Sequence, residues 1–290
     1  MARVGVDGLM ISPQGKGHAR SERHARWQAI AAANLDLRLG PRYLAGIGEA
    51  AVVVPTQAWF LHERNRPLHE LRAAGTPFYA LTRAYLDCAP GPVVGVSGSH
   101  GKSTTAALVA ALLRVAGDSP SATVRLAGND RHDVPCLVEV AGGDARDALV
   151  LEVSNRQLLQ MDRAPEIACL TNVTANHLEE HGGLGGYIEA KRRLFALPGN
   201  RVAVRNGDDP LSLARCAPAK GAREWRFAIG PDGLGPCDGV HEADGGLVVR
   251  RDGAPAERLP LASTGLIGAH NRANMRAAVA VVASMGPIPS

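Results

Sequence analysis

The sequence predicts an α/β protein, in which a mostly parallel P-loop sheet with helices on both faces follows a smaller α/β domain. From residue 92 onward, short apolar runs alternate with stretches of helical periodicity, which is typical of parallel strands joined by helices. A glycine-rich turn separates the first of these runs from the first helical stretch. The length of 290 residues accommodates about two domains of roughly 150 residues each.

The elements of the larger domain are expected from their apolar patterns. Short runs rich in β-branched or apolar residues predict strands over residues 92–97, 123–126, 148–153, 167–173, 201–205 and 224–229. Helical patterns cover residues 102–116, 184–197, 210–216 and 270–285. Residues 247–251 and 257–262 flank a loop that opens with Asp252-Gly253, and this turn signal predicts a hairpin.

The first ninety residues carry a weaker pattern. Strands are expected at residues 3–7, 50–55 and 77–80, and helices at 21–34 and 68–74. The segment Cys88-Ala-Pro-Gly-Pro92 resists regular structure because it holds two prolines and a glycine. We therefore expect an N-terminal, substrate-binding-like α/β domain over residues 1–90 and a central domain over residues 91–290.

The content of charged residues limits which kinds of molecule the protein is expected to bind. Lysine and arginine total 32 against 28 acidic residues, and this net charge of +4 excludes a strongly basic nucleic-acid binder. Only four of the basic residues are lysines, namely Lys16, Lys102, Lys191 and Lys220. Because lysine is the cation that can become a nucleophile, each of the four is a candidate for chemistry.

The number and spacing of the cysteines, and the short length of the longest apolar stretch, indicate a cytoplasmic protein with reduced thiols. The five cysteines are odd in number, far apart and without CxxC spacing, which disfavours a disulfide scaffold or a structural zinc site. The longest nearly apolar stretch, residues 106–115, is too short to cross a bilayer. We expect contact with neither a membrane nor nucleic acid.

The strongest chemical motif lies between the first expected strand and helix of the central domain. It reads Gly95-Val-Ser-Gly98-Ser-His-Gly101-Lys102-Ser103-Thr104. Glycines let backbone N–H groups and the helix N-terminus face an anion, Lys102 supplies a cation for phosphates, and the Ser103 hydroxyl can ligate Mg²⁺. The strict P-loop pattern has glycine where Val96 stands, so the motif is a variant. Its strand–helix context favours nucleotide binding over a glycine-rich turn with a coincidental Lys-Ser.

Three further residues are candidates with competing explanations. Glu152 ends an apolar strand, where a P-loop protein needs a metal-binding carboxylate, but a helix-capping acid explains it equally well. His177 follows a buried-looking strand, at the edge where α/β sheets bind ligands, although a structural histidine is the commoner case. Lys191 lies in a helix with an apolar stripe, and the simplest expectation for it is the solvated face.

Two weaker motifs complete the set. Asn206-Gly-Asp208-Asp209 follows an expected strand, and Gly268-Ala-His270-Asn271 opens the last helix. Asn271 and Asn274 are three residues apart and hence share a helical face. They could hydrogen-bond a base or cap the helix N-terminus.

Taken together in this order, the motifs resemble those of the Mur ligase family, which adds amino acids to the peptidoglycan precursor. The resemblance covers about residues 50–285 and is nearest to the D-glutamate-adding branch. The matching motifs are Gly98–Thr105, Leu151–Leu158, Thr171–His177, the helix around Lys191, Asn206–Asp209 and Gly268–Asn271. Gln157 favours the D-glutamate branch, whereas His100 is more like the alanine-adding branch.

The resemblance implies ATP-driven amide formation through an acyl phosphate, with ATP and Mg²⁺ as cofactors and a nucleotide-sugar peptide and an amino acid as substrates. The implied catalytic residues are Lys102, His177 and Lys191. Nucleotide contacts are implied for Gly98, Ser99, His100, Gly101, Lys102, Ser103, Thr104 and Asn271. Metal contacts are implied for Ser103, Glu152, His177 and Lys191, and substrate contacts for Asn129, Ser154 and Gln157.

For Lys191 the family analogy is a carbamate formed with CO₂, which converts a cation into a metal-ligating anion. That chemistry requires a neutral amine, so we expect a depressed pKa for Lys191.

The sequence departs from the family at both ends. The first 45 residues lack the Gly-x-Gly turn of the branch's uridine-nucleotide domain, and the chain stops shortly after the helix of Asn271. Without the family's third domain, three expectations stay open: the chain is a fragment or a gene-split protein, it works with a separate chain that supplies that domain, or it is no longer a competent ligase. The alternatives are a ligase recruited to another pathway and a non-catalytic nucleotide-binding protein.

Overall fold

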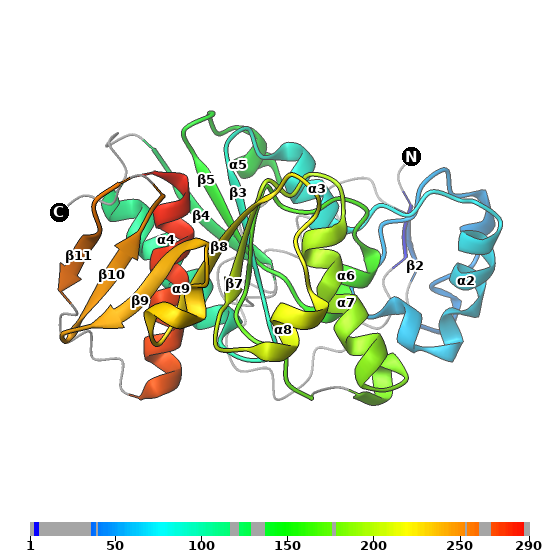
Figure 1. The fold of residues 1–290 in the computed structure, drawn as a ribbon. Helices are drawn as coiled ribbons and strands as arrows, with labels where there is room; N and C mark the ends of the chain where they lie inside the picture. The colour runs from blue at the N-terminus through cyan, green and yellow to red at the C-terminus, as the bar shows by residue number, and fades with distance from the viewer. Residues whose placement is uncertain are drawn as a thin grey trace. The chain divides into compact units, whose positions relative to one another are not determined.

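The computed structural model describes residues 3–5, 36–38, 40–116, 122–128, 137–175, 178–252, 254–260 and 268–286 (Figure 1). The chain divides into two compact units, Met1–Tyr79 and Ala80–Ser290. Helix α3 (Leu81–Cys88) falls in the second unit, because Tyr85 and Leu86 are buried in that unit's core. The division therefore lies before α3, whereas the sequence places a boundary after it, at residue 90.

The first unit is small and built mainly from short helices. Strands β1 (Arg3–Gly5) and β2 (Asp36–Arg38) pair in parallel. Its described helices are η1 (Gly40–Arg42), η2 (Ile47–Glu49), η3 (Trp59–Leu61), η4 (Glu63–Asn65) and α2 (Arg66–Ala73). Val53, Trp59 and Leu68 form its buried core.

The expectations for the first unit have mixed outcomes. The strand at residues 3–7 and the helix at 68–74 are confirmed as β1 and α2. The strands expected at 50–55 and 77–80 are wrong, because these segments share a single parallel bridge between Val53 and Phe78. The helix expected at 21–34 lies outside the described residues.

The second unit is built on a nine-stranded sheet of order β11-β10-β9-β8-β7-β6-β3-β5-β4. Neighbouring strands pair in parallel from β4 across to β9, and the pairs β9–β10 and β10–β11 are antiparallel. The strands are β3 (Val93–Ser97), β4 (Val124–Gly128), β5 (Ala148–Glu152), β6 (Ile167–Leu170), β7 (Val202–Asn206), β8 (Arg223–Ala228), β9 (Asp238–Ala243), β10 (Gly246–Arg250) and β11 (Glu257–Pro260).

Helices cover both faces of this sheet (Figure 1). The described helices are α4 (Lys102–Ala116), α5 (Leu137–Ala141), α6 (Asn155–Gln160), η5 (Leu178–His181), α7 (Leu184–Ala196), α8 (Pro210–Arg215), η6 (Pro231–Leu234) and α9 (Ala269–Met285). The α/β class with a mostly parallel, P-loop-bearing sheet is therefore confirmed.

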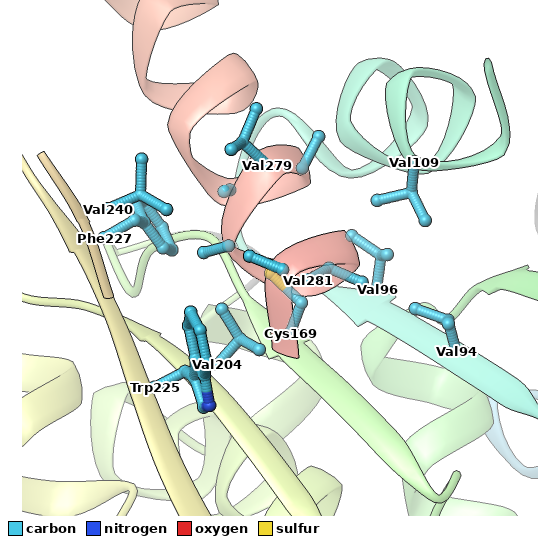
Figure 2. Close-up of a cluster of buried hydrophobic side chains, with 14 of the residues drawn as sticks. Val94, Val96, Val109, Cys169, Val204, Trp225, Phe227, Val240, Val279 and Val281 are labelled. Atoms are coloured by element: carbon cyan, nitrogen blue, oxygen red, sulfur yellow. The ribbon is translucent and has the colours of Figure 1, made fainter. Parts of the chain in front are cut away.

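Two apolar clusters hold the layers together because successive residues of a strand face opposite sides of the sheet. On one face α4 and α9 pack on side chains such as Val94, Val204 and Trp225. In Figure 2, Val279 and Val281 of α9 lie over Phe227, Val240 and Cys169 of the strands. On the other face α3, α6 and α7 pack on Leu149, Leu151 and Leu170.

Most elements of the second unit lie where the sequence predicts them. The strand runs at 92–97, 123–126, 148–153, 167–173, 201–205 and 224–229 correspond to β3 to β8, and the expected hairpin is the antiparallel pair β10–β11. The four predicted helices correspond to α4, α7, α8 and α9. The pattern missed α3, α5 and α6, which are eight residues or shorter, and β9, whose sequence Asp-Gly-Val-His-Glu-Ala is largely polar.

Candidate active site

The loop that follows β3 lies at the centre of the candidate site. β3 is flanked by β5 and β6, and because the three strands are parallel, their carboxyl ends share one edge of the sheet. The loop residues from Gly98 to Gly101 join β3 to the N-terminus of α4. The first turn of α4 presents backbone N–H groups without helical acceptors, and this end of a helix favours anions.

Two glycines of this loop are required by its close packing. Gly98 has φ 152° and Gly101 has φ 80°, both in the region that L side chains rarely adopt. A Cβ on Gly98 would lie 1.9 Å from Oγ1 of Thr171, and a Cβ on Gly101 would lie 2.2 Å from Oδ1 of Asn274. The loop therefore sits directly against the end of β6 and the start of α9.

The residues after β6 fasten the loop. The backbone N–H of His100 donates to Oδ1 of Asn172 at 3.0 Å, and Nδ2 of Asn172 donates to the His100 carbonyl at 3.1 Å. The Thr171 hydroxyl donates to the same carbonyl at 2.6 Å. Sequence reasoning assigned no role to Thr171 or Asn172, although both belong to the motif that contains His177.

Lys102 begins α4 and turns back over the loop. Its Nζ donates to the carbonyl oxygens of Gly98 at 3.1 Å and Ser99 at 3.0 Å. Burial lowers the pKa of Lys102, and the nearby charge of Glu152 opposes that shift. The neighbouring Ser103 is exposed, so its hydroxyl is accessible to a ligand.

Glu152 ends β5 at the same edge of the sheet and is 2 % exposed. It does not cap the following helix, since the N-cap of α6 is Ser154. Ser154 and Gln157 form a capping box: the Ser154 N–H donates to Oε1 of Gln157 at 2.8 Å, and the Gln157 N–H donates to the Ser154 hydroxyl at 3.3 Å. The capping explanation for Glu152 is therefore wrong, and a metal-binding role stays a prediction.

Lys191 is buried beside the loop rather than on a solvated face. The residue is 1 % exposed, and its Nζ donates to Oγ of Ser97 at 3.1 Å and to the Gly98 carbonyl at 2.9 Å. Burial, reinforced by the positive charge of Lys102, lowers the pKa of Lys191 from 10.5 to about 7. A depressed pKa is what the sequence analysis expects, and it makes the neutral amine accessible near neutral pH.

Tyr187 is a further site residue that the sequence pattern places only in an apolar stripe. It is fully buried on α7, and its hydroxyl lies 2.9 Å from Oγ of Ser99. Nζ of Lys191 lies 5.3 Å from the centroid of its ring. The spacing of four residues between Tyr187 and Lys191, which places both on one face of a helix, was the available signal.

Asn271 and Asn274 lie at the start of α9, beside the loop. The N-cap of α9 is Gly268, which has no side chain that could cap this end. Asn274 is buried against Gly101, and its Nδ2 donates to Oδ1 of Asn271 at 3.4 Å. Asn271 is thus linked to the loop through Asn274. Asn129 and His177, the remaining candidates, lie outside the described residues.

The residues present fit a nucleotide with Mg²⁺. Mg²⁺ is usually held by one or two carboxylates together with substrate phosphates, and not by a cage of protein side chains. The buried Glu152 carboxylate and the Ser103 hydroxyl, at the anion-binding end of α4, are such a partial donor set. The described part of the chain contains no group of three or more His, Cys, Asp and Glu side chains that could hold a metal ion.

Within the described residues, every helix is too short or too polar to cross a membrane.

Comparison with known proteins gives the family. Residues 96–282 match the Mur ligase middle domain. The chain is 38% identical over 206 residues to UDP-N-acetylmuramoylalanine--D-glutamate ligase of Jannaschia sp. (strain CCS1), covering 69% of this chain and 43% of that protein. It is 34% identical over 250 residues to the ligase of the same name from Symbiobacterium thermophilum, covering 84% and 53%.

A solved structure shows the same fold. The UDP-N-acetylmuramate:L-alanyl-gamma-D-glutamyl-meso-diaminopimelate ligase from Neisseria meningitides matches with a TM-score of 0.55 at 21% identity, covering 90% of this chain and 82% of that one. The chain spans about half the length of the curated relatives it matches. The match to the middle-domain model extends over more than half of the chain, and the chain belongs to the Mur ligase family.

Proposed function

We propose that this chain carries the nucleotide-binding core of an ATP-dependent ligase that forms an amide bond through an acyl phosphate. The single observation that carries the proposal is Lys191, a buried amine held against the Gly98 carbonyl of the P-loop, with a pKa lowered to about 7. Burying a lysine lowers the stability of the fold, because desolvation disfavours the charged form of the amine. A functional role for Lys191 explains why a lysine occupies this position.

The loop and α4 are proposed to hold ATP. Backbone N–H groups from Gly98 to Thr104 would face the phosphates, with the Lys102 ammonium as their counter-charge. Asn271 would contact the adenine, since it lies beside the loop at the start of α9. Glu152 and Lys191 would then lie at the same edge of the sheet as the phosphates.

Mg²⁺ would be held by Ser103 and Glu152, with His177 and a carbamylated Lys191 as further ligands. When bound, the metal neutralises charge on the transferring oxygens. The carbamate forms when the neutral Nζ of Lys191 attacks the carbon of CO₂, making an N–C bond and releasing a proton. The lowered pKa supports this step, because it raises the fraction of neutral amine.

The chemistry proposed for the substrates is carboxylate activation followed by amide formation. A carboxylate oxygen takes the γ-phosphoryl group and ADP leaves. An incoming amine then attacks the acyl carbon, loses a proton and displaces phosphate. The names of the relatives support UDP-N-acetylmuramoyl-L-alanine and D-glutamate as this pair. Asn129, Ser154 and Gln157 are the proposed substrate contacts.

We also propose a cytoplasmic location, and the buried free thiols of Cys169 and Cys216 support it.

The test is phosphate release from ATP and Mg²⁺ in the presence of UDP-N-acetylmuramoyl-L-alanine and D-glutamate. The assay is run with this chain alone, and again with a second chain added that carries the part of the related ligases not matched by this chain. We expect release that requires both substrates and falls at least 100-fold in Lys191→Ala, a loss of roughly 3 kcal/mol in transition-state stabilisation. Absence of turnover in both formats, with MgATP still bound, favours a non-catalytic nucleotide-binding protein instead.

A further inference from the structure

His181 is a partly buried residue at the end of η5 for which the proposed chemistry has no role. It lies on the connection between β6 and α7, four residues beyond His177. Its Nε2 is 2.6 Å from Nδ2 of Asn155, the first residue of α6. Its ring meets the ring of Tyr187 edge to face, with centroids 5.3 Å apart and an interplanar angle of 73°.

Tyr187 in turn contacts the P-loop. The Ser99 hydroxyl is 3.0 Å from the Thr174 carbonyl oxygen, to which it donates, and it accepts from the Thr174 N–H at 2.9 Å. A serine hydroxyl has a single proton, so Tyr187 must be the donor in its 2.9 Å bond to Ser99. The orientation of the Tyr187 hydroxyl is therefore defined, and it depends on where the ring is held.

The network joins three parts of the site that are distant in sequence. Asn155 follows Ser154 at the start of α6, Ser99 lies in the nucleotide loop, and the Tyr187 ring lies beside Nζ of Lys191. His181 is the group that touches both Asn155 and Tyr187. An edge-to-face aromatic contact and a partly buried hydrogen bond both depend strongly on geometry, so such a residue can fix a ring in place.

We propose that His181 is a positioning residue that holds Tyr187 against Ser99 and so sets the P-loop for nucleotide binding. The inference rests on the proposed nucleotide site and deepens it: the histidine touches no nucleotide and acts through the tyrosine. The bond to Asn155 extends the same constraint to α6, where the proposed substrate contacts Ser154 and Gln157 lie.

The experiment is calorimetric titration of the full chain with MgATP, comparing His181→Ala, Tyr187→Phe and the double variant. Each single change is expected to weaken MgATP binding about tenfold, because each removes a contact of the network that holds Ser99 of the P-loop. The double variant should be less than about threefold weaker than Tyr187→Phe alone, since His181 has nothing left to position. Urea unfolding of each variant checks that it is folded.

Two further variants sharpen the comparison. His181→Phe keeps an aromatic ring against Tyr187 and should keep the affinity within about threefold of the original chain. His241→Ala is the matched control, because this histidine lies on β9, outside the network, and its Nδ1 is 3.1 Å from the carbonyl oxygen of the neighbouring Glu242. The affinity of this control should stay within about twofold of the original.

Two outcomes overturn the inference in different ways. If the original chain binds MgATP and His181→Ala binds it equally well, or if the two losses simply multiply in the double variant, His181 is not a positioning residue while the nucleotide site stands. If the original chain does not bind MgATP, the proposed function fails and the inference fails with it.

Discussion

At the scale of single residues, the environment of Lys191 is the most informative feature of the site. A lysine amine is solvated in an unfolded chain, but here it is 1 % exposed and bonded to Ser97 and Gly98. Hydrogen bonds to neutral acceptors offset only part of the cost of desolvating a charge. The amine therefore loses its proton more readily, and its pKa falls to about 7.

The lowered pKa predicts how stability depends on pH. Between about pH 7 and 10.5 the unfolded chain keeps a proton on Lys191 that the folded chain has released, so the free energy of unfolding rises with pH in this window. Below pH 7 both states are protonated and the gain is absent. From pH 7.5 to 9.5 the original chain should gain about 2 kcal/mol more than Lys191→Met.

Urea unfolding at several pH values in CO₂-free buffer measures this difference. Excluding CO₂ keeps the amine free, so that a carbamate does not alter the titration. Parallel profiles for the two proteins would show that the Lys191 amine is not desolvated in the folded chain.

The position of a site residue could be predicted from the sequence where the residue belongs to a strand–helix motif. It could not be predicted where the packing of one element on another determines it. Lys102 and Glu152 lie at the predicted edge of the sheet because their positions follow from strand–helix alternation. The burial of Lys191 and the contact between Tyr187 and Ser99 depend on how α7 lies against β3, which periodicity along one helix does not contain.

At the scale of elements, the turn between β3 and α4 depends on two glycines that are tightly enclosed. Gly101 combines a positive φ of 80° with close packing, since an added Cβ would lie 2.2 Å from Oδ1 of Asn274. Asn274 belongs to α9, so a change at this glycine reaches the helix that also carries Asn271.

Gly101→Ala is expected to weaken MgATP binding at least tenfold and to lower the free energy of unfolding by about 3 kcal/mol, from backbone strain and displacement of Asn274. Gly221→Ala is the matched control, since Gly221 has φ 91° and no atom within 4 Å of an added Cβ. It should lower stability by about 1 kcal/mol and leave MgATP affinity unchanged. Calorimetry and urea unfolding measure both quantities, and equal losses in the two variants would show that the contact with Asn274 is unimportant.

Element prediction succeeded where length and apolar pattern agree. α4, α7 and α9 are long and periodic, and β3 and β5 are fully buried, so each gives a clear signal. The short α6 is stabilised by the capping box of Ser154 and Gln157, and β9 by pairing with both β8 and β10. Local propensity alone does not reveal elements that depend on caps or neighbours.

At the scale of the whole molecule, the described residues of the proposed nucleotide site belong to one compact unit. Lys102, Glu152, Lys191 and Asn271 all lie within Ala80–Ser290. The boundary before α3 could not be derived from the proline-rich segment after it, because only the packing of Tyr85 and Leu86 assigns α3 to this unit.

A chain that begins at Ala80 is therefore expected to fold and to bind MgATP with an affinity within about twofold of the 290-residue chain. Circular dichroism establishes that the shorter chain is folded, and calorimetric titration compares the two affinities. A folded shorter chain with affinity reduced more than about tenfold would mean that residues before Ala80 contribute to the nucleotide site.

The loop between β3 and α4 is proposed to bind the phosphates of ATP, and the most direct measurement of this is the Kd of MgATP for the original chain beside Lys102→Met. A charge-assisted bond to phosphate contributes roughly 1.5–3 kcal/mol, so the variant should bind about 10- to 100-fold more weakly. Lys220→Met, which removes an exposed lysine, should leave the Kd unchanged. An original chain that does not bind MgATP, or a Lys102→Met chain that binds it equally well, would contradict the account.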